Sequence, residues 1–395
     1  MGGVTLPPAA WRDRAGLARV IDALGSGTAR IVGGAVRDTL LGIDTADVDL
    51  ATTHAPETVV DLLEAARIKA VPTGIKHGTI TAVASDEVYE VTTLRRDLET
   101  DGRHATVAFT DDWREDAARR DFTINALYAD PASGEIFDYF GGIDDLAARR
   151  VRFIGDPLTR IAEDHLRILR FFRFLARFGD VADVEGLKAC ADRANDLMAL
   201  SRERIANELL RLLVAPRAPE VVASMVEHGI FVPVLPEIVD VLQLAALARR
   251  EDEAGIAPDP IRRLAAILPS NAATVATIGA RLKLSKLQRR RLESAAEPVD
   301  MEPRALAYRL GTEFAVDRLL LAGDSLGDLD GWTPPALPLS GGALVAKGLT
   351  AGPDVARTLH RVEDRWIAEG FPDAARVAEI ADEEVAQVLA DIRKS

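Results

Sequence analysis

The spacing of hydrophobic and polar residues changes near residue 150. Before that point, short apolar or alternating runs are separated by stretches with helical spacing. After it, nearly every segment repeats apolar residues at intervals of three or four, as amphipathic helices do. The pattern predicts an α+β fold, with a small mixed sheet and its helices on one side over residues 1–150 and an all-α region after it.

Individual elements can be placed in the first region. ARIV (29–32) and DVDLAT (47–52) are typical of strands, and AVRDTLL (35–41) between them is typical of a helix. Pro56 begins a further helix that extends to Arg67, because proline is tolerated in a first helical turn. The start of the chain is therefore expected to alternate strands and helices.

The next segments are less regular. GTITAVASDEVYEVTTLR predicts two strands joined by a polar turn. The stretch from Arg95 to Trp113 is polar and weakly periodic, so we expect a mobile loop there. RRDFTINALY is expected to be helical and GEIFDYF to be a strand. An arginine-rich helix is then predicted from Pro157 to Phe178, ended by Gly179.

The composition limits the compartment and the number of domains. A chain of 395 residues is long enough for more than one packed unit. Cys190 is its one cysteine, which excludes an intrachain disulfide and is typical of a reducing cytoplasm. No apolar run reaches the length of a membrane span, and the N-terminus lacks a basic start followed by an apolar stretch. We expect a cytoplasmic protein with no membrane partner.

The charge is acidic overall and basic in places. A net charge of −14 argues against a protein that coats nucleic acid indiscriminately. Eight arginines nevertheless lie between Arg149 and Arg177, and the run from Arg281 to Arg291 is a second basic block. Such blocks suit a partner that must be held and released. The alternative is that they are solvated helix faces.

Two aspartates on a predicted strand suggest a metal site. Asp47 and Asp49 are two residues apart, so their carboxylates project from one face while Val48 and Leu50 point into the core. A divalent cation removes the repulsion between them, and Mg²⁺ usually takes one or two carboxylates together with waters and substrate phosphates. Alone, such a pair is more often a solvated strand edge.

A glycine turn just upstream suggests phosphate binding. Gly33 and Gly34 open the helix after the first strand, where backbone amides can approach an anion and Arg37 can add a forked contact. Asp38 is expected to brace Arg37. A tight strand-to-helix turn explains the glycines as well. Together with Asp47 and Asp49, however, the turn describes a site for a nucleoside triphosphate and its metal.

A third pattern, EDHLR, suggests selection of a base. Asp164 and Arg167 are three apart on a predicted helix, so an acceptor lies beside a forked donor. Cytosine and adenine each present an amino donor next to a ring-nitrogen acceptor, whereas guanine and uracil present the reverse. The pair could therefore accept C and A, with about 1–3 kcal/mol of discrimination for each good two-point match. An intrahelical ion pair is the alternative.

Two further arginines continue the three-residue spacing of that helix. Each step from Arg167 to Arg170 and Arg173 rotates away from Asp164 by about 60°, so they drift off the base-reading face. Triphosphate or RNA backbone is their expected partner, and surface solvation is the alternative for Arg173.

These motifs resemble those of a known superfamily. IVGGAVRDTLLG followed by DVDLAT resembles the signature of the DNA polymerase beta nucleotidyltransferase superfamily. PTGIKHGTITAV, YEVTTLR, RRDFTINALY, EDHLRILRFFRFLARF and LSRERIANELLRLL resemble its class II tRNA nucleotidyltransferases and bacterial poly(A) polymerases. The resemblance covers roughly residues 30 to 215. It implies a catalytic head over 1–150, a base-recognising neck over 151–215, a helical body over 216–335 and a tRNA-binding tail over 336–395.

The resemblance also assigns residues. The metal-binding aspartates of the family fall on Asp47 and Asp49, and its nucleotide-binding glycine and arginine fall on Gly34 and Arg37. Glu90 is the candidate for a third carboxylate, with an exposed strand glutamate as the alternative. By the same analogy Arg120 reaches the phosphates or ribose. Asp121 and Asn125 are expected to order that region, or else to act as a helix cap and a surface polar residue.

The implied activity is template-independent addition of C, C and A to the 3′ end of tRNA from CTP and ATP, with Mg²⁺ and release of pyrophosphate. Two other activities of the family, poly(A) synthesis and A-only addition, stay open as alternatives. A third alternative, outside these activities, is a catalytically inactive RNA-binding protein. The acidic C-terminus disfavours poly(A) synthesis, and the predicted loop with DGRH at Asp101 to His104 favours complete CCA addition. DNA is not expected as a partner. Expected tRNA contacts beyond residue 215, with surface charge as the alternative, are Lys283, Lys286, Arg289, Arg290 and Arg291.

Overall fold

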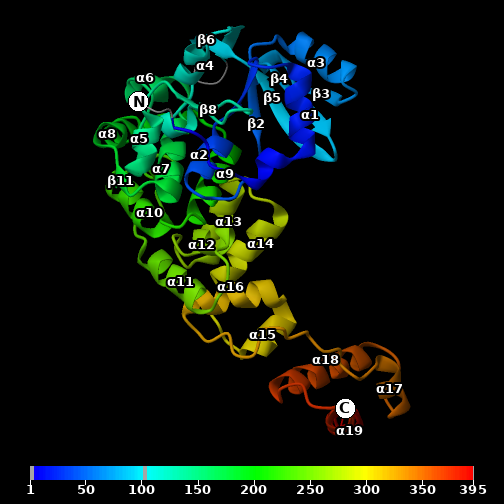
Figure 1. Cartoon of the computed structure of the whole chain (residues 1–395). Helices are drawn as coiled ribbons and strands as arrows, with labels where there is room; N and C mark the ends of the chain where they lie inside the picture. Colours follow the sequence, from blue (N-terminus) through cyan, green and yellow to red (C-terminus); the bar gives the residue numbers. More distant parts are fainter. Residues whose placement is uncertain (1–3, 101–104, 395) are drawn as a thin grey trace. The chain divides into compact units, whose positions relative to one another are not determined.

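The computed structural model describes residues 4–100 and 105–394. It divides into two compact units, Met1–Val241 and Leu242–Ser395. The first contains the sheet and the helices that follow it, and the second is helical (Figure 1). The expected boundaries after residues 150, 215 and 335 lie inside these units, so the four-part division stays a prediction.

The first unit contains the expected mixed sheet. Its seven strands are arranged in the order β3-β4-β5-β2-β1-β8-β9; β2 and β5 run parallel, and the other neighbours run antiparallel. Helices α1 and α3 pack on each other and against β3 and β4 (Figure 1). The strands of the chain are β1 (Ala29–Val32), β2 (Asp49–Thr52), β3 (Lys69–Gly74), β4 (Thr79–Ala84), β5 (Glu87–Thr93), β6 (Arg95–Thr100), β7 (Ala105–Phe109), β8 (Leu127–Ala129), β9 (Ile136–Asp138), β10 (Arg150–Val151) and β11 (Val181–Ala182).

Helix boundaries of the first unit occur at the predicted Pro56, where α3 begins, and before the predicted Gly179, where α7 ends. Ser201 is an N-cap whose side chain accepts a hydrogen bond from the backbone of Arg204. The helices of the first unit are α1 (Ala15–Leu24), α2 (Gly34–Leu40), α3 (Pro56–Ala65), α4 (Trp113–Ala118), α5 (Gly142–Ala147), α6 (Pro157–Glu163), α7 (Arg167–Phe178), α8 (Val184–Asp192), α9 (Arg202–Leu213) and α10 (Ala218–Glu227), with 3₁₀ turns at Ala10–Asp13, Ile75–His77, Thr123–Asn125 and Ala194–Ala199.

The prediction of a loop between Arg95 and Trp113 is wrong for most of that segment. β6 and β7 form an antiparallel hairpin that pairs Arg95 with Phe109 and Thr100 with Ala105. Backbone pairing between neighbouring strands does not depend on strong apolar alternation, which is why the polar sequence concealed it. The predicted loop residues Asp101 to His104 lie outside the described residues.

The prediction of a helix over RRDFTINALY is also wrong. The segment contains a short 3₁₀ turn, Thr123–Asn125, followed by β8. All three residues of β8 are buried, and the strand pairs with β1 and β9. The sheet therefore overrides a local pattern that is compatible with either helix or strand.

The long helix expected from Pro157 to Phe178 is interrupted. α6 ends at Glu163 and α7 begins at Arg167, with Asp164 in extended backbone at φ −150° and ψ 106°. The carboxylate of Asp164 accepts a hydrogen bond from the backbone N–H of Leu166 at 3.1 Å. An aspartate that bonds its own backbone two residues on competes with helix formation, which explains the break.

The second unit consists of helices, and two of its hydrophobic cores meet at α15. Ala305 of α15 belongs to a core with Leu344 and Trp366, whereas the next residue, Leu306, belongs to a core with Leu319. WTPPALPLSGG is mostly irregular and precedes the final helices. The helices are α11 (Leu242–Glu253), α12 (Pro260–Ala265), α13 (Ala272–Arg281), α14 (Lys286–Ala295), α15 (Pro303–Leu310), α16 (Thr312–Ala322), α17 (Gly341–Ala346), α18 (Pro353–Ala368) and α19 (Ala374–Lys394).

None of the helices within residues 4–100 and 105–394 is long and apolar enough to cross a bilayer.

Candidate active site

A cavity of about 500 Å³ in the first unit brings most of the predicted site residues together. It lies where the sheet meets the helices α2 and α7. Arg95, Arg119 and Phe174 also line it and were not predicted. The predicted residues among its lining are Gly33, Gly34, Arg37, Asp49, Arg120, Asp121, Asn125, Asp164, Arg167 and Arg170.

The glycine turn has the backbone that its sequence suggested. Gly33 has φ +70°, a region that favours glycine, and its N–H donates to the carbonyl of Leu127 on β8 at 3.1 Å. A Cβ at Gly33 would lie 3.6 Å from the guanidinium of Arg120 and 3.6 Å from the carbonyl oxygen of Asn125. The turn therefore lies directly against the arginine that was predicted to contact the nucleotide.

Arg37 is held in place from three sides. Its Nε donates to Asp38 at 2.7 Å, its Nη1 donates to the side-chain oxygen of Asn125, and its guanidinium lies 4.1 Å from the ring centroid of Phe178. The expectation that Asp38 braces Arg37 is confirmed. Burial lowers the pKa of Arg37, and Asp38 partly offsets this effect. A preorganised guanidinium at the edge of a cavity is suited to a phosphate oxygen.

Asp121 links Arg37 to α7. Its Oδ1 accepts from the side chain of Asn125 at 3.0 Å, and its Oδ2 accepts from Nε of Arg170 at 2.7 Å. Burial tends to raise the pKa of Asp121, but the charge of Arg170 and the hydrogen bonds outweigh it, so the net shift is downward. Asp121 and Asn125 therefore contact Arg37 and Arg170 at the cavity, and their role in nucleotide binding stays a prediction. Arg170 lines the cavity while held by this carboxylate.

The three predicted acidic residues, Asp47, Asp49 and Glu90, lie at the start of β2 and on the neighbouring strand β5, and together they form what we call the acidic edge. β2 begins at Asp49, two residues after Asp47, and Val48 and Leu50 are buried as predicted. Glu90 of β5 is the register partner of Asp49. The pKa of Asp49 is raised, first by reduced hydration and then by the charges of Glu90 and Asp47, while Arg120 opposes the shift. Asp47 and Glu90 are not part of the cavity lining.

The chemistry of this edge fits a hard divalent cation. Within residues 4–100 and 105–394, no three acidic, histidine or cysteine side chains are arranged so that they could hold a metal ion by themselves. The carboxylates Asp47, Asp49 and Glu90 instead form an open acidic edge whose mutual repulsion a cation would relieve. Mg²⁺ is commonly held in this way, by one or two carboxylates with waters and substrate phosphates completing its coordination.

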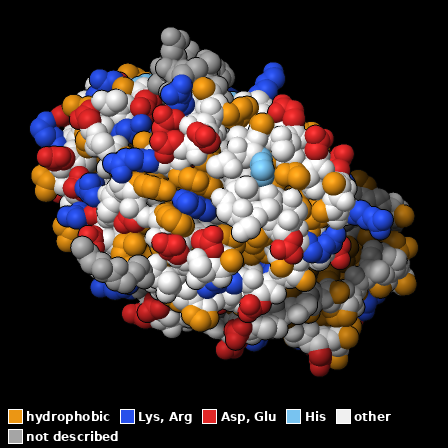
Figure 2. Space-filling model, turned by 45° about the horizontal axis from the view of Figure 1, so that its top comes forward, with side chains coloured by type: hydrophobic (Ala, Val, Ile, Leu, Met, Phe, Trp, Pro, Cys, Tyr) orange, Lys and Arg blue, Asp and Glu red, His pale blue; other side chains and the backbone are white. Residues whose placement is uncertain are grey.

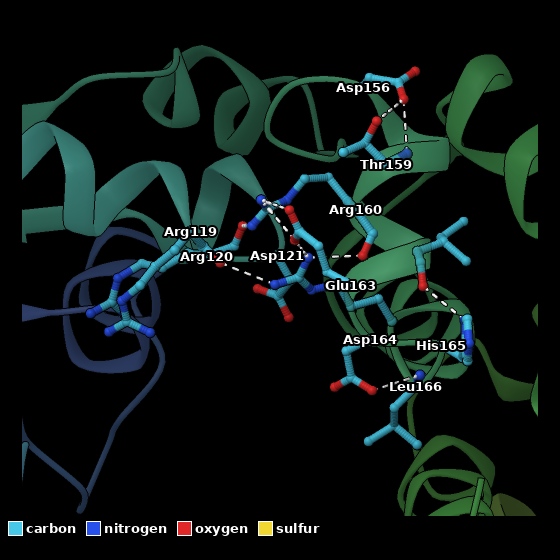
Figure 3. A network of polar contacts seen from close by, with 12 residues as sticks. Arg119, Arg120, Asp121, Asp156, Thr159, Arg160, Glu163, Asp164, His165 and Leu166 are labelled. Atoms are coloured by element: carbon cyan, nitrogen blue, oxygen red, sulfur yellow. Dashed lines mark hydrogen bonds and ion pairs between the residues drawn. The ribbon is translucent and has the colours of Figure 1, made fainter. Parts of the chain in front are cut away.

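Asp164 and Arg167 both line the cavity, but not as neighbours on one helix. Arg204 of α9 donates from one nitrogen to both oxygens of Asp164, at 3.1 and 2.9 Å. Arg167 donates to Glu163 and to the carbonyl oxygens of Arg160 and Arg119. The intrahelical Asp-Arg ion pair is therefore excluded. The two side chains project from opposite ends of the helix break (Figure 3 shows Asp164 and its neighbours).

Arg173 does not face the cavity. Its Nε donates to the buried carboxylate of Glu208 at 2.6 Å, and its guanidinium stacks on Phe174 at 4.3 Å. The predicted rotation away from Asp164 assumed one continuous helix and does not apply, because Asp164 lies outside α7. The partner of Arg173 is a carboxylate of α9 and not RNA or solvent. Arg173 holds α7 against α9.

The basic block of the second unit divides into exposed and buried residues. Lys283, Lys286 and Arg290 are exposed, and Arg289 is half-buried. Arg291 is 7% exposed and donates to Asp317 at 2.8 and 2.9 Å, so its prediction as an RNA contact is corrected to a structural ion pair. On the face drawn in Figure 2, basic and acidic side chains are interspersed.

Comparisons with known proteins place these residues in a family context. Residues 29–152 match the family model described as "Poly A polymerase head domain", and residues 184–242 match "Probable RNA and SrmB- binding site of polymerase A". A "CCA tRNA nucleotidyltransferase 1, mitochondrial" of Mus musculus is 34% identical over 371 residues, which are 87% of this chain and 83% of the relative. The relative of the same name in Danio rerio is 37% identical over 85% of this chain and 83% of its own length.

Solved structures agree in fold. The Bacillus stearothermophilus CCA-adding enzyme in complex with CTP superposes with a TM-score of 0.71 at 26% identity, covering 95% of this chain and 98% of that one. The Thermotoga maritima CCA-adding enzyme complexed with tRNA superposes with a TM-score of 0.67 at 20% identity, covering 91% of each chain, which shows likeness of fold. The predicted α+β architecture is thus confirmed.

Proposed function

The chain belongs to the class II CCA-adding enzymes of the tRNA nucleotidyltransferase family, and we propose that it adds C, C and A to the 3′ end of tRNA from CTP and ATP. One observation carries the proposal. A single cavity contains the glycine turn, an aspartate of the acidic edge and the Asp164/Arg167 pair, which are the parts needed to hold a triphosphate, its metal and its base.

The reaction requires no nucleophilic side chain. The 3′-hydroxyl oxygen of the RNA attacks the α-phosphorus, a new P–O bond forms, the bond between the α- and β-phosphates breaks, and pyrophosphate leaves. Gly33 and Gly34 give the phosphates access to backbone, and Arg37 and Arg120 donate to phosphate oxygens or ribose. Positioning and electrostatic stabilisation supply most of the acceleration.

The acidic edge is the proposed metal site. Nucleotidyltransferases of this family are generally metal-dependent, and Asp47 and Asp49, with Glu90 as a third carboxylate, would hold Mg²⁺ here. A bound divalent ion lowers the pKa of the attacking hydroxyl and neutralises charge on the leaving pyrophosphate. The support from this chain is the open cluster of like charges and the raised pKa of Asp49.

Base selection is assigned to Asp164 and Arg167. Oδ1 of Asp164 already accepts from Arg204 and from the backbone of Leu166. Its Oδ2 can accept a second hydrogen bond while Arg204 stays in place, so an amino group of cytosine or adenine can be bound without releasing the anchor. Arg167 would then donate to the adjacent ring nitrogen. Guanine and uracil present the opposite pattern and leave both groups unpaired.

We assign catalysis to the head, base recognition to the neck, and tRNA contacts to the exposed Lys283, Lys286 and Arg290 with the half-buried Arg289. Their charge and exposure support this assignment, and Arg291 is left out because it is buried. The cytoplasm is the proposed compartment, supported by the lone cysteine Cys190, which is buried.

The match to a poly(A) polymerase head favours A-only addition or poly(A) synthesis as a second candidate. Purified protein is incubated with tRNA ending at the discriminator base, or ending in CC, with CTP and ATP singly and together, and product ends are sequenced. We expect CC from CTP alone and CCA from both. Long A tails would indicate a poly(A) polymerase. Addition of A only to tRNA ending in CC would indicate an A-adding enzyme. If the protein binds tRNA but does not extend it, it is an inactive RNA-binding protein.

A further inference from the structure

A buried aspartate behind the cavity connects elements that the sequence motifs treat separately. Asp116 lies on α4, is 1% exposed, and does not line the cavity. Its Oδ1 accepts from Nε of Arg119 at 2.8 Å and from the backbone N–H of Arg95 at 3.3 Å. Its Oδ2 accepts from the hydroxyl of Tyr128 at 2.6 Å and from Nη2 of Arg120 at 3.2 Å. Three of these partners, Arg95, Arg119 and Arg120, line the cavity.

The four hydrogen bonds keep this carboxylate charged. Burial alone would raise the pKa of Asp116, but the charges of Arg120 and Arg119 and the hydrogen bond from Tyr128 outweigh burial and lower it to about 2. A buried carboxylate that accepts only from fixed donors is rigid, because any displacement leaves a charge unpaired. Asp116 therefore defines the position of both guanidinium groups.

Arg120 is fixed with two of its three nitrogens. Nε donates to the hydroxyl of Tyr128 at 3.0 Å and Nη2 to Asp116, while Nη1 is the nitrogen nearest the glycine turn, 3.6 Å from the place of a Cβ on Gly33. Because these partners hold Nε and Nη2, Nη1 of Arg120 is directed toward the proposed phosphate site. A planar, fixed fork of this kind is suited to phosphate oxygens.

The backbone of the same two arginines is held from the neck. Nη2 of Arg167 donates to the carbonyl of Arg119 at 3.0 Å, and Nη2 of Arg160 donates to the carbonyl of Arg120 at 2.9 Å. Figure 3 shows the side chains of Arg119 and Arg120 extending away from these contacts. Main chain and side chains of the pair are therefore fixed independently, the side chains by Asp116.

We propose that Asp116 is a positioning residue for nucleotide addition, which holds Arg119 and Arg120 in the geometry that binds the triphosphate. The inference rests on the proposed function and deepens it. Because CTP and ATP have the same triphosphate, the contribution of Asp116 is the same for both nucleotides. This distinguishes it from Asp164 and Arg167, whose proposed contacts are with the base.

The test measures KM and kcat for CTP and for ATP, and equilibrium binding of labelled CTP, in the full chain. Asp116→Asn has one acceptor oxygen and turns an NH₂ group toward one pair of donors, so we expect KM for both nucleotides and Kd for CTP to rise by about tenfold or more. Tyr128→Phe removes only the hydroxyl beside Arg120 and is expected to raise KM by about threefold. Asp116→Glu keeps both acceptors and is expected to recover part of the loss.

Asp145 supplies the matched control. It is also fully buried, and it accepts from Thr123, Arg150 and Arg152, none of which lines the cavity. Asp145→Asn is expected to lower the unfolding temperature and leave KM and Kd unchanged. The two variants together separate a loss of fold stability from a loss of nucleotide positioning.

The proposal is overturned if Asp116→Asn binds both nucleotides within about twofold of the wild-type protein, if only one nucleotide is affected, or if Asp145→Asn raises KM equally. If Asp116→Asn does not fold, Tyr128→Phe with unchanged KM and Kd gives the same negative answer. A wild-type chain that binds CTP but does not extend tRNA would refute the proposed function, while the binding measurements still decide the role of Asp116.

Discussion

Arg204 donates to both carboxylate oxygens of Asp164 across an interval of 40 residues. The contact joins α9 to the break between α6 and α7. It also gives this carboxylate, which we propose to select the base, a fixed orientation that α6 itself does not supply, because Asp164 lies beyond the last helical residue. The proposed choice of base therefore involves an arginine outside the predicted site.

Removing this anchor should weaken the choice of base. We expect Arg204→Ala to lower the rate of CTP and ATP incorporation by about tenfold and to increase incorporation of UTP and GTP, because a charge-assisted contact is lost and Asp164 becomes free to rotate. Competition among the four nucleotides, read by sequencing of tRNA ends, measures the effect. Arg211→Ala, an exposed position on the same helix, is the control. Unchanged selectivity in Arg204→Ala would contradict the assignment.

We expect Asp49 to be needed for nucleotide addition while its charge lowers the stability of the folded chain. We expect Asp49→Ala to reduce nucleotide addition by about a hundredfold or more, since metal stabilisation of the transition state is worth several kcal/mol. Asp44→Ala, an exposed aspartate five residues upstream, should keep wild-type activity. Normal addition by a folded Asp49→Ala protein would refute the metal site.

The same residue predicts a pH dependence of stability. The pKa of Asp49 is raised by reduced hydration and by Glu90, so the folded chain binds this proton more tightly than the unfolded chain. Its contribution to stability therefore falls as pH rises from about 4. Without divalent ions, Asp49→Asn should unfold at a slightly higher temperature than the wild type at pH 7.5, and the difference should disappear near pH 4. Thermal unfolding at both pH values checks the sign, and a lower unfolding temperature for Asp49→Asn at pH 7.5 would reverse it.

Two glycines with nearly equal φ angles help to separate strain from function. Gly33 has φ +70° and Gly42 has φ +69°, so alanine at either position should be strained, by about 1 kcal/mol or more. A Cβ at Gly42 meets nothing within 4 Å, whereas a Cβ at Gly33 approaches the guanidinium of Arg120. Both variants should unfold earlier, but only Gly33→Ala should raise KM for CTP and ATP. An equal change in KM would mean that strain alone is responsible.

Arg290 and Arg291 are neighbours in the chain, but we expect Arg291 to stabilise the fold and Arg290 to contribute to tRNA binding. Arg291→Met removes a positive charge that pairs with the buried carboxylate of Asp317. We expect it to lower the free energy of unfolding by about 3–5 kcal/mol near neutral pH. Burial, partly offset by Arg291, raises the pKa of Asp317 to about 6, so its contribution to stability falls as pH rises from about 4 through about 6. The cost of Arg291→Met should therefore be smaller at pH 5 than at pH 7.5, as urea unfolding can measure.

Arg290→Met, at the exposed neighbouring position, is the matched variant. It should change stability by less than about 0.5 kcal/mol and lower both the affinity for tRNA and its salt dependence, by about one counterion. A binding titration at several salt concentrations measures both. Equal tRNA affinity of Arg290→Met and wild type at every salt concentration would remove this block from the proposed RNA surface.

The site was predictable where a residue type itself has a chemical meaning. Glycines that begin a helix, paired aspartates and the Asp164/Arg167 pattern can be identified in the chain, and the structure brings most of them into one cavity. Asp116 and Arg204 could not be identified in this way, because many carboxylates and arginines of the chain are ion-paired and only the folded backbone selects the partners. The RRD motif, which follows Asp116, and the LSRER motif, which ends with Arg204, were the available signal.

The errors in the fold have related causes. Periodicity continues through Pro157–Phe178, but one side chain, Asp164, bonds the backbone of Leu166 and interrupts the helix. The apolar run that became β8 is compatible with helix or strand, and its neighbours in the sheet decide. The hairpin of β6 and β7 is stabilised by backbone pairing, which apolar spacing does not report.

The two faces of α15 restrict how this chain can be cut or recombined. Ala305 and Leu306 are consecutive, yet each completes a different hydrophobic core. A truncation or a chimaeric junction at residue 335, between α16 and α17, would expose the side of α15 that Trp366 and Leu344 cover. Exchange of the C-terminal segment between relatives therefore has to transfer α15 with it, or match its exposed face residue by residue.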